Sequence, residues 1–240
     1  MSEASFGLLQ AFSTPKSEDS INEDQWFASE DGKIIALCDG ATISYDSRGW
    51  AEVLAKGFVI DQSLGLDWLR AAITDYSLQI DRESLSWSAQ AAFDRGSFST
   101  LAGIICDNSG QAARVFAIGD TLVVLADQDQ LLRSYPYSDA EQFDLVPTLM
   151  SSAFAQNASI TDEDFTNWWI DLNFSGLEKP RVMMTTDALG RWLLDCPAER
   201  VPILLGIDNH SDFESLVQEE RRAGRMRRDD TTLLVLGVAG

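Results

Sequence analysis

Histidine, cysteine and basic residues are scarce in this chain of 240 residues, which has one histidine, three cysteines and 18 Lys+Arg against 38 Asp+Glu. The cysteines at positions 38, 106 and 196 match neither a zinc motif nor a disulfide framework, so we expect buried thiols in a reducing compartment. The formal net charge of −20 repels phosphate backbones, which argues against nucleic-acid binding. No apolar run is long enough to cross a bilayer and no signal peptide is evident, so we expect a cytoplasmic protein without a membrane partner.

The pattern of apolar residues predicts an α+β fold. Short strands are expected over residues 5–12, 24–29 and 33–40, and two amphipathic helices follow between residues 50 and 80. Strands in series are expected from residue 98 to residue 135, with a tight hairpin turn at Gly119 and Asp120. A strand over 181–187, a short helix, a helix capped by Ser211 and Glu214, and a last strand from Thr231 complete the chain. This order lacks regular βαβ alternation, so antiparallel sheets covered by helices are favoured.

Residues 138–176 are irregular, acidic and aromatic, and they include Trp168 and Trp169. Such a long segment without a clear periodic pattern is more typical of a lid or flap than of a framework element. The sequence therefore predicts a single domain over residues 1–240 with a flap at 138–176.

Aspartates stand at the ends of several apolar runs. "KIIALCDG" ends at Asp39, "ARVFAIGD" at Asp120 and "RVMMTTD" at Asp187, while Asp229 precedes the run "TTLLVLGV". Any one of them has a simple explanation, because aspartate is a good turn and cap residue. Four such residues in one core, with a single histidine in the chain, indicate a site of hard oxygen ligands for Mg²⁺ or Mn²⁺.

Six motifs occur in an order that resembles the metal-dependent serine/threonine phosphatases of the protein phosphatase 2C family. They are "INEDQW", "ALCDGA", "GSFSTLAGII", "FAIGDTLVVL", "MTTDALG" and "RRDDTTLLVL", and together they span nearly the whole chain. The resemblance implies a four-layer α-β-β-α sandwich, in which two antiparallel sheets are flanked by helices. It also implies two Mg²⁺ or Mn²⁺ ions that activate a water to hydrolyse phosphoserine or phosphothreonine, and a phosphoprotein substrate that a serine/threonine kinase has modified.

The resemblance assigns the metal ligands residue by residue. Asp39 is implied to bridge both ions, and the Gly40 carbonyl to bind one of them. Asp187 and Asp229 are implied to bind the other ion, so Asp39, Asp187 and Asp229 would carry catalysis. The remaining ligands, direct or through water, are implied to be Glu23 and Asp24.

The chain departs from the family's pattern in the region that would bind substrate phosphate. No arginine precedes "NED", which leaves Lys16 and Arg48 as candidates. Arg48 is the predicted substrate-binding residue, because a guanidinium can bind two phosphate oxygens and because it opens a helix. An exposed arginine at the start of a helix is an equally good interpretation of Arg48.

Other departures leave alternatives open. Arg191 stands where many family members have an acid for a third metal, so Asp120 is either a ligand or a turn residue. Five arginines between positions 221 and 228 favour either a helix C-terminus or a phosphate or partner site. The alternatives to a protein phosphatase are a non-catalytic phosphatase-like domain that binds a partner, and a hydrolase of small phosphate esters on the same core.

Overall fold

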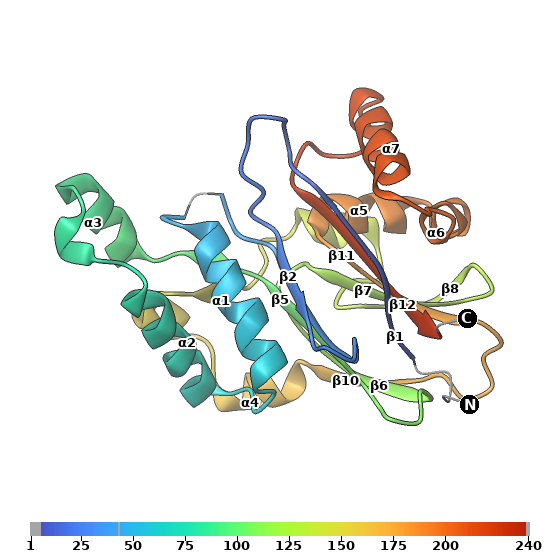
Figure 1. Ribbon diagram of the computed structural model, residues 1–240, viewed down its shortest axis with the longest axis horizontal. Coiled ribbons are helices and arrows are strands. Elements are labelled where there is room, and N and C mark those ends of the chain that lie inside the picture. The colour runs from blue at the N-terminus through green and yellow to red at the C-terminus, as the bar shows by residue number, and fades with distance from the viewer. Residues whose placement is uncertain (1–5, 43, 239–240) are drawn as a thin grey trace.

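The computed structural model describes residues 6–42 and 44–238; Ser5, where the first predicted strand begins, and both ends of the predicted domain lie outside this part. Two five-stranded antiparallel sheets pack face to face, and helices cover their outer faces (Figure 1). The predicted four-layer sandwich is therefore confirmed. In spatial order, the first sheet contains β1 (Phe6–Thr14), β12 (Thr231–Val238), β11 (Pro180–Thr185), β7 (Leu122–Asp127) and β8 (Gln130–Tyr135). The second contains β10 (Trp169–Asn173), β6 (Ala112–Ile118), β5 (Leu101–Cys106), β3 (Ile34–Cys38) and β2 (Gln25–Ala28).

The remaining elements are helices and a small sheet. The α-helices are α1 (Ser47–Ile60), α2 (Leu66–Leu78), α3 (Trp87–Arg95), α4 (Asp162–Asn167), α5 (Asp187–Asp195), α6 (Pro197–Leu205) and α7 (His210–Arg222). The 3-10 helices are η1 (Arg82–Ser84), η2 (Ala140–Asp144) and η3 (Phe154–Asn157), and β4 (Phe98–Ser99) pairs with β9 (Met150–Ser151).

Helix α1 forms and packs as its sequence pattern predicts. The side chain of Asp46 caps its first turn by accepting a hydrogen bond from the Gly49 backbone N–H at 2.9 Å. Trp50, Leu54 and Phe58 recur every four residues and are fully buried against the second sheet. The Phe58 ring lies so close to Gly103 of β5 that a Cβ there would be 2.1 Å from a ring carbon.

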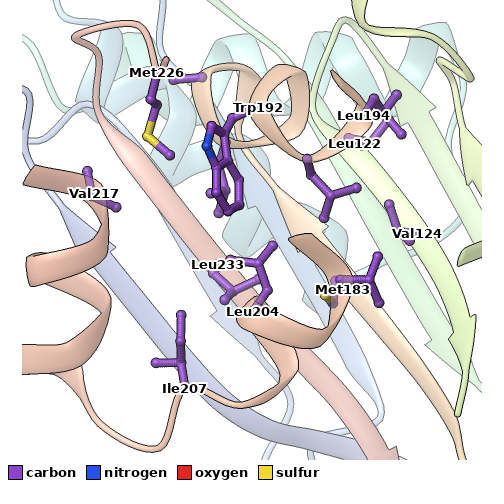
Figure 2. Close-up of a cluster of buried hydrophobic side chains, with 14 of the residues drawn as sticks. Leu122, Val124, Met183, Trp192, Leu194, Leu204, Ile207, Val217, Met226 and Leu233 are labelled. Carbon is purple, nitrogen blue, oxygen red and sulfur yellow. The ribbon is translucent and has the colours of Figure 1, made fainter. Parts of the chain in front are cut away.

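Helices α5, α6 and α7 cover the first sheet. Figure 2 shows this cluster, in which Trp192, Leu204 and Val217 of the helices face Met183 and Leu233 of the sheet. All five side chains are 3% exposed or less. Burial of this apolar face holds the helices on the sheet, because each Å² of apolar surface removed from water contributes about 25 cal/mol.

The predicted hairpin at Gly119 and Asp120 is wrong. Strand β6 belongs to the second sheet and β7 to the first, so the chain crosses from one sheet to the other here. Gly119 makes the sharp turn with φ of +95°, a conformation that glycine adopts without strain. The crossover places Asp120 at the end of the sandwich.

The predicted flap at 138–176 is wrong for its last part. Residues Trp169–Asn173 form strand β10, which pairs with β6 at the edge of the second sheet. Phe143 and Phe165 of the same segment are buried in the cores beneath the helices. Alternation of polar and apolar residues in "WIDLN" is the signal for this strand, and the neighbouring acids and tryptophans obscured it.

Helix α7 begins earlier than predicted. Asn209 caps it by accepting a hydrogen bond from the Asp212 N–H at 3.0 Å, so the expected capping box of Ser211 and Glu214 is wrong. Asparagine is as good a cap as serine, and it occurs two residues before Ser211.

Candidate metal centre

The topology brings the strand-end aspartates to one end of the sandwich. Strands β3 and β6 run in the same direction, because each is antiparallel to β5 between them. In the other sheet β11 is antiparallel to β12, so the end of β11 lies beside the start of β12. Asp39, Asp120, Asp187 and Asp229 follow or precede these strand ends and line a single pocket of about 160 Å³. Its other lining residues are Gly40, Ala41, Thr42, Thr100, Pro147 and Leu149.

The backbone of Asp39 is held firmly in place. Its N–H donates to the Thr100 hydroxyl at 2.8 Å, and its carbonyl accepts from the Thr100 N–H at 3.0 Å and the Ser99 hydroxyl at 2.8 Å. The Thr100 hydroxyl is in turn 2.6 Å from that of Thr121. These contacts fix the direction in which the Asp39 carboxylate leaves β3, and the sequence pattern of apolar runs gave no sign of them.

Gly40 packs directly against the start of α1. A Cβ at this position would lie 2.8 Å from the Ser47 carbonyl oxygen and 2.9 Å from its Cβ. Only glycine fits here, so the Gly40 backbone lines the pocket without a side chain over it.

Asp187 and Asp229 approach the pocket from the first sheet. Asp187 opens helix α5, and its carboxylate accepts a hydrogen bond from the Ala188 N–H at 2.5 Å. The Asp229 carboxylate accepts one from the Asp230 N–H at 2.9 Å. The Arg221 guanidinium donates to the Asp229 carbonyl oxygen and thus holds this turn from outside the pocket.

Burial and mutual repulsion raise the pKa values of these carboxyl groups. Burial raises the pKa of Asp187 to about 7, and the charges of Asp120 and Asp229 add to the effect. Burial, followed by the charges of Asp24 and Asp187, raises the pKa of Asp39 well above its usual value. The pKa values of Asp120 and Asp229 are also raised, mainly by burial. Close, partly dehydrated carboxylates are stable in the ionised form only with a compensating cation.

Asp24 lies behind the pocket between the two sheets. One of its oxygens accepts hydrogen bonds from the hydroxyls of Thr186 at 3.0 Å and Thr232 at 2.7 Å. The other oxygen is buried without a partner among the described residues. Burial and the charge of Asp230 raise the pKa of Asp24, and this group does not line the pocket.

Glu23 is engaged by other side chains. It forms an ion pair with Lys16 at 2.6 Å and accepts hydrogen bonds from the hydroxyls of Thr42 and Ser47. The Lys16 ammonium also donates to Thr42 at 3.1 Å, so it lies at the edge of the carboxylate pocket. Glu23 itself does not line that pocket.

The two predicted phosphate-binding candidates are placed very differently. Arg48 is exposed on α1 and does not line the carboxylate pocket, so the structure does not bring it together with the aspartates. Lys16 is held beside the pocket by Glu23 and Thr42. The guanidinium group and the position at the start of a helix favoured Arg48, whereas the long loop after β1 folds back and brings Lys16 closer.

A second group of charges borders the pocket. Asp144 of η2 pairs with Arg191 at 2.5 Å and with Arg227 at 2.7 Å. The charge of Arg227 lowers the pKa values of Asp120 and Asp187 and so offsets part of the effect of burial. Arg191 thus binds Asp144. Only the three-dimensional fold joins these residues, since Asp144 and Arg227 are 83 positions apart.

The donor set of the pocket fits a hard divalent cation. Carboxylate oxygens and the backbone of Gly40 are the ligand types that Mg²⁺ and Mn²⁺ prefer, and burial raises the pKa values of Asp39 and Asp187, so a bound cation would stabilise their ionised forms. Within residues 6–42 and 44–238, no three His, Cys, Asp or Glu side chains are close enough to hold an ion as they stand. An ion would therefore have to draw the carboxylates closer together.

No helix in the described ranges is both long and apolar enough to cross a membrane. No family model matches the chain, and no curated protein matches it in sequence.

Solved structures share the fold over almost the whole chain. One is the catalytic domain of the serine/threonine protein phosphatase PstP in complex with two manganese ions, at TM-score 0.63 and 16% identity, with 98% of this chain and 100% of that chain covered. Another is the serine/threonine phosphatase Stp1 from Staphylococcus aureus, at TM-score 0.57 and 15% identity, with 100% and 99% covered. A third is the Mycobacterium tuberculosis serine/threonine phosphatase PstP/Ppp, at TM-score 0.59 and 16% identity, with 96% and 98% covered. The chain therefore has the fold of bacterial serine/threonine phosphatases.

Proposed function

We propose that this chain is a metal-dependent phosphatase that hydrolyses phosphoserine and phosphothreonine in proteins. The observation that carries the proposal is the convergence of Asp39, Asp120, Asp187 and Asp229 in one pocket at the end of the sandwich. The same fold occurs in a serine/threonine phosphatase that was solved with two manganese ions. A kinase that phosphorylates the same protein substrate would be the opposing partner, and a cytoplasmic location would suit both.

The proposed metal site contains two Mg²⁺ or Mn²⁺ ions. Asp39 and the Gly40 carbonyl would hold one ion, and Asp39, Asp187 and Asp229 the other. When bound, such ions lower the pKa of a coordinated water and neutralise charge on phosphoryl oxygens. Asp24 and Glu23 do not line the pocket, so their part in the site would be to orient water or ligands from behind and beside it.

The protein groups around the pocket would position the substrate. Lys16 is a cation at the pocket's edge, and we propose that it, rather than Arg48, attracts the reacting phosphate. Thr42 lines the same wall and can donate its hydroxyl proton to a phosphoryl oxygen once it releases Glu23. Pro147 and Leu149 form an apolar wall, which would limit the access of water to the reacting group.

The test is phosphatase activity of the purified chain in Mn²⁺, with and without a chelator. Turnover of p-nitrophenyl phosphate that requires the metal, and that is lost in Asp39→Asn, would support the proposal. Asn keeps the size of the side chain and removes the charge that the ions need. Near wild-type turnover by Asp39→Asn would contradict the placement of the site.

Two observations favour a second candidate function, a non-catalytic domain that binds a partner. The described carboxylates do not form a ready-made ligand group, and no arginine precedes "NED". Absence of turnover with any metal, together with binding of a phosphoprotein, would establish this alternative. A phosphopeptide panel separates a protein phosphatase from a hydrolase of small phosphate esters.

A further inference from the structure

The arginines in the segment from the end of α7 to Arg228 differ in whether they pair with a carboxylate. Arg225 forms two hydrogen bonds with Glu220, at 2.7 Å and 2.5 Å, and Arg227 pairs with Asp144. No ion pair joins Arg222 or Arg228 to a carboxylate in the part of the chain that the structure describes. Two exposed cations without ionic partners thus remain in a chain of net charge −20.

Arg222 and Arg228 line a pocket of about 500 Å³ between α7 and the loop that follows β1. Both elements lie at the same end of the molecule (Figure 1). The other lining residues are Thr14, Pro15, Lys16, Ser17, Glu18, Asp19, Glu214, Gln218 and Arg221. This basic pocket is larger than the carboxylate pocket, so it has room for a phosphate group and part of the chain that carries it.

The basic pocket is built on a fixed frame rather than on mobile side chains alone. Arg221 at its inner wall donates hydrogen bonds to the Pro15 carbonyl at 2.9 Å and the Thr231 hydroxyl at 2.8 Å. Its Nε is buried without a partner among the described residues, which leaves a charged donor unsatisfied. Burial lowers the pKa of Arg221, and the like charge of Arg228, which lines the same pocket, adds to this effect.

Three acids also line the basic pocket, and they do not neutralise its arginines. Glu18 and Asp19 are exposed on the loop, where water and salt screen their charges. Glu214 accepts a hydrogen bond from Gln218 at 3.2 Å. None of the three pairs with Arg222 or Arg228 in the described part of the chain, so these guanidinium groups remain available to an anion.

The basic pocket and the carboxylate pocket share a wall. Lys16 lines the basic pocket, and its ammonium touches Thr42 of the carboxylate pocket. Arg221 lines the basic pocket and donates a hydrogen bond to the carbonyl oxygen of Asp229, and Asp229 lines the carboxylate pocket. A ligand in the basic pocket would therefore lie next to a substrate in the carboxylate pocket.

We propose that Arg222 and Arg228 form a second phosphate-binding site beside the proposed catalytic site. Arginine suits this task because its guanidinium binds two phosphate oxygens at once. The phosphate would be either free inorganic phosphate or a second phosphorylated residue of the substrate. The assignment to a second phosphorylated residue of the substrate rests on the proposed function. The binding of inorganic phosphate does not depend on that function.

The first experiment measures binding of inorganic phosphate to the full chain in the presence of a chelator, at ionic strength held constant with chloride. Phosphate can then bind only to protein groups. We expect Arg228→Gln and Arg222→Gln each to weaken binding about tenfold, as for the loss of one hydrogen bond to a charged group. Arg95→Gln removes the same charge from an exposed position of α3 and should leave binding unchanged. Absence of phosphate binding in the wild type, or equal losses in Arg95→Gln, would overturn the proposal.

The second experiment identifies the source of the phosphate. Peptides with one phosphoserine are compared in Mn²⁺ with peptides in which a second phosphoserine is moved stepwise along the chain. If the substrate supplies the second phosphate, one spacing lowers KM about tenfold in the wild type and in Arg95→Gln, and the gain disappears in Arg228→Gln. Equal KM values at every spacing, with phosphate binding intact, assign the site to free phosphate. Loss of turnover for all peptides would contradict the proposed function and leave the binding result standing.

Discussion

Replacing Asp187 by asparagine should stabilise the protein when metal is absent. Burial and the neighbouring carboxylates raise the pKa of Asp187 from 3.8 to about 7, so its ionised form is disfavoured in the folded state. Each unit of pKa is about 1.4 kcal/mol, so the full shift would correspond to about 4 kcal/mol above pH 7. We expect about half of this, because water enters the pocket and the neighbouring carboxylates share the proton. Loss of a negative charge at the start of α5 subtracts about 0.5 kcal/mol.

The net gain of about 1–2 kcal/mol should raise the melting temperature of Asp187→Asn by about 2–8 °C in chelator. The size of this difference in melting temperature depends on pH. Below the unfolded-state pKa the carboxyl is neutral in both states and the two proteins should melt together, while above pH 7 the ionised wild type bears the full penalty. The difference should therefore open between about pH 4 and pH 7 and then stay constant.

Thermal unfolding followed by circular dichroism, across this pH range, measures the effect. In saturating Mn²⁺ the order should reverse, because the wild type keeps the proposed metal ligand Asp187, which the variant lacks. The asparagine can still accept the hydrogen bond from the Ala188 N–H, so loss of this bond does not contribute to the difference in melting temperature. A chelated variant that melts below the wild type at high pH would refute the reasoning.

Three further predictions concern metal, phosphate and packing. Asp39→Asn should lose metal affinity and turnover together while it retains the fold. Calorimetric titration with Mn²⁺ measures the affinity, and circular dichroism checks the fold. Wild-type metal affinity in this variant would contradict the bridging role proposed for Asp39. Lys16→Ala should raise KM for a phosphopeptide several-fold and Arg48→Ala should not, because only Lys16 lies at the pocket; the opposite ranking would restore Arg48 as the phosphate-binding residue. Gly103→Ala should destabilise the fold by about 1–3 kcal/mol in urea, because its Cβ would overlap the Phe58 ring; an unchanged midpoint would mean that α1 can move away.

The residues of the carboxylate pocket could be predicted because they interrupt a strong pattern. Asp39, Asp187 and Asp229 adjoin long apolar runs, and such runs become buried strands whatever their partners are. The order of the elements favoured antiparallel sheets covered by helices, and the resemblance to the phosphatase 2C family implied the sandwich. Asp120 was recognised for the same reason, but the crossing between sheets was not, since β6 and β7 are equally apolar.

The surroundings of the pocket could not be predicted, because they depend on contacts between distant parts of the chain. Glu23 was expected among the ligands, and the folded chain pairs it with Lys16 and two hydroxyl groups. Nothing in the local sequence fixes where the long loop after β1 places Lys16. Arg48 is near Asp39 in the sequence, yet the Arg48 side chain is exposed and does not line the pocket.

The carboxylate of Asp230 fastens the two ends of the loop after β1. One of its oxygens accepts the Lys16 N–H and the other accepts the Glu23 N–H, each at 2.7 Å. Asp230 immediately precedes β12, which lies between β1 and β11 and is the last strand along the chain. During synthesis on the ribosome, some 200 further residues must therefore be added after Lys16 and Glu23 before their hydrogen bonds to Asp230 can form. A nascent chain that stops before Asp229 lacks both this carboxylate and the Asp230 clamp that sets Lys16, so the proposed metal site would be completed in a single late step of folding.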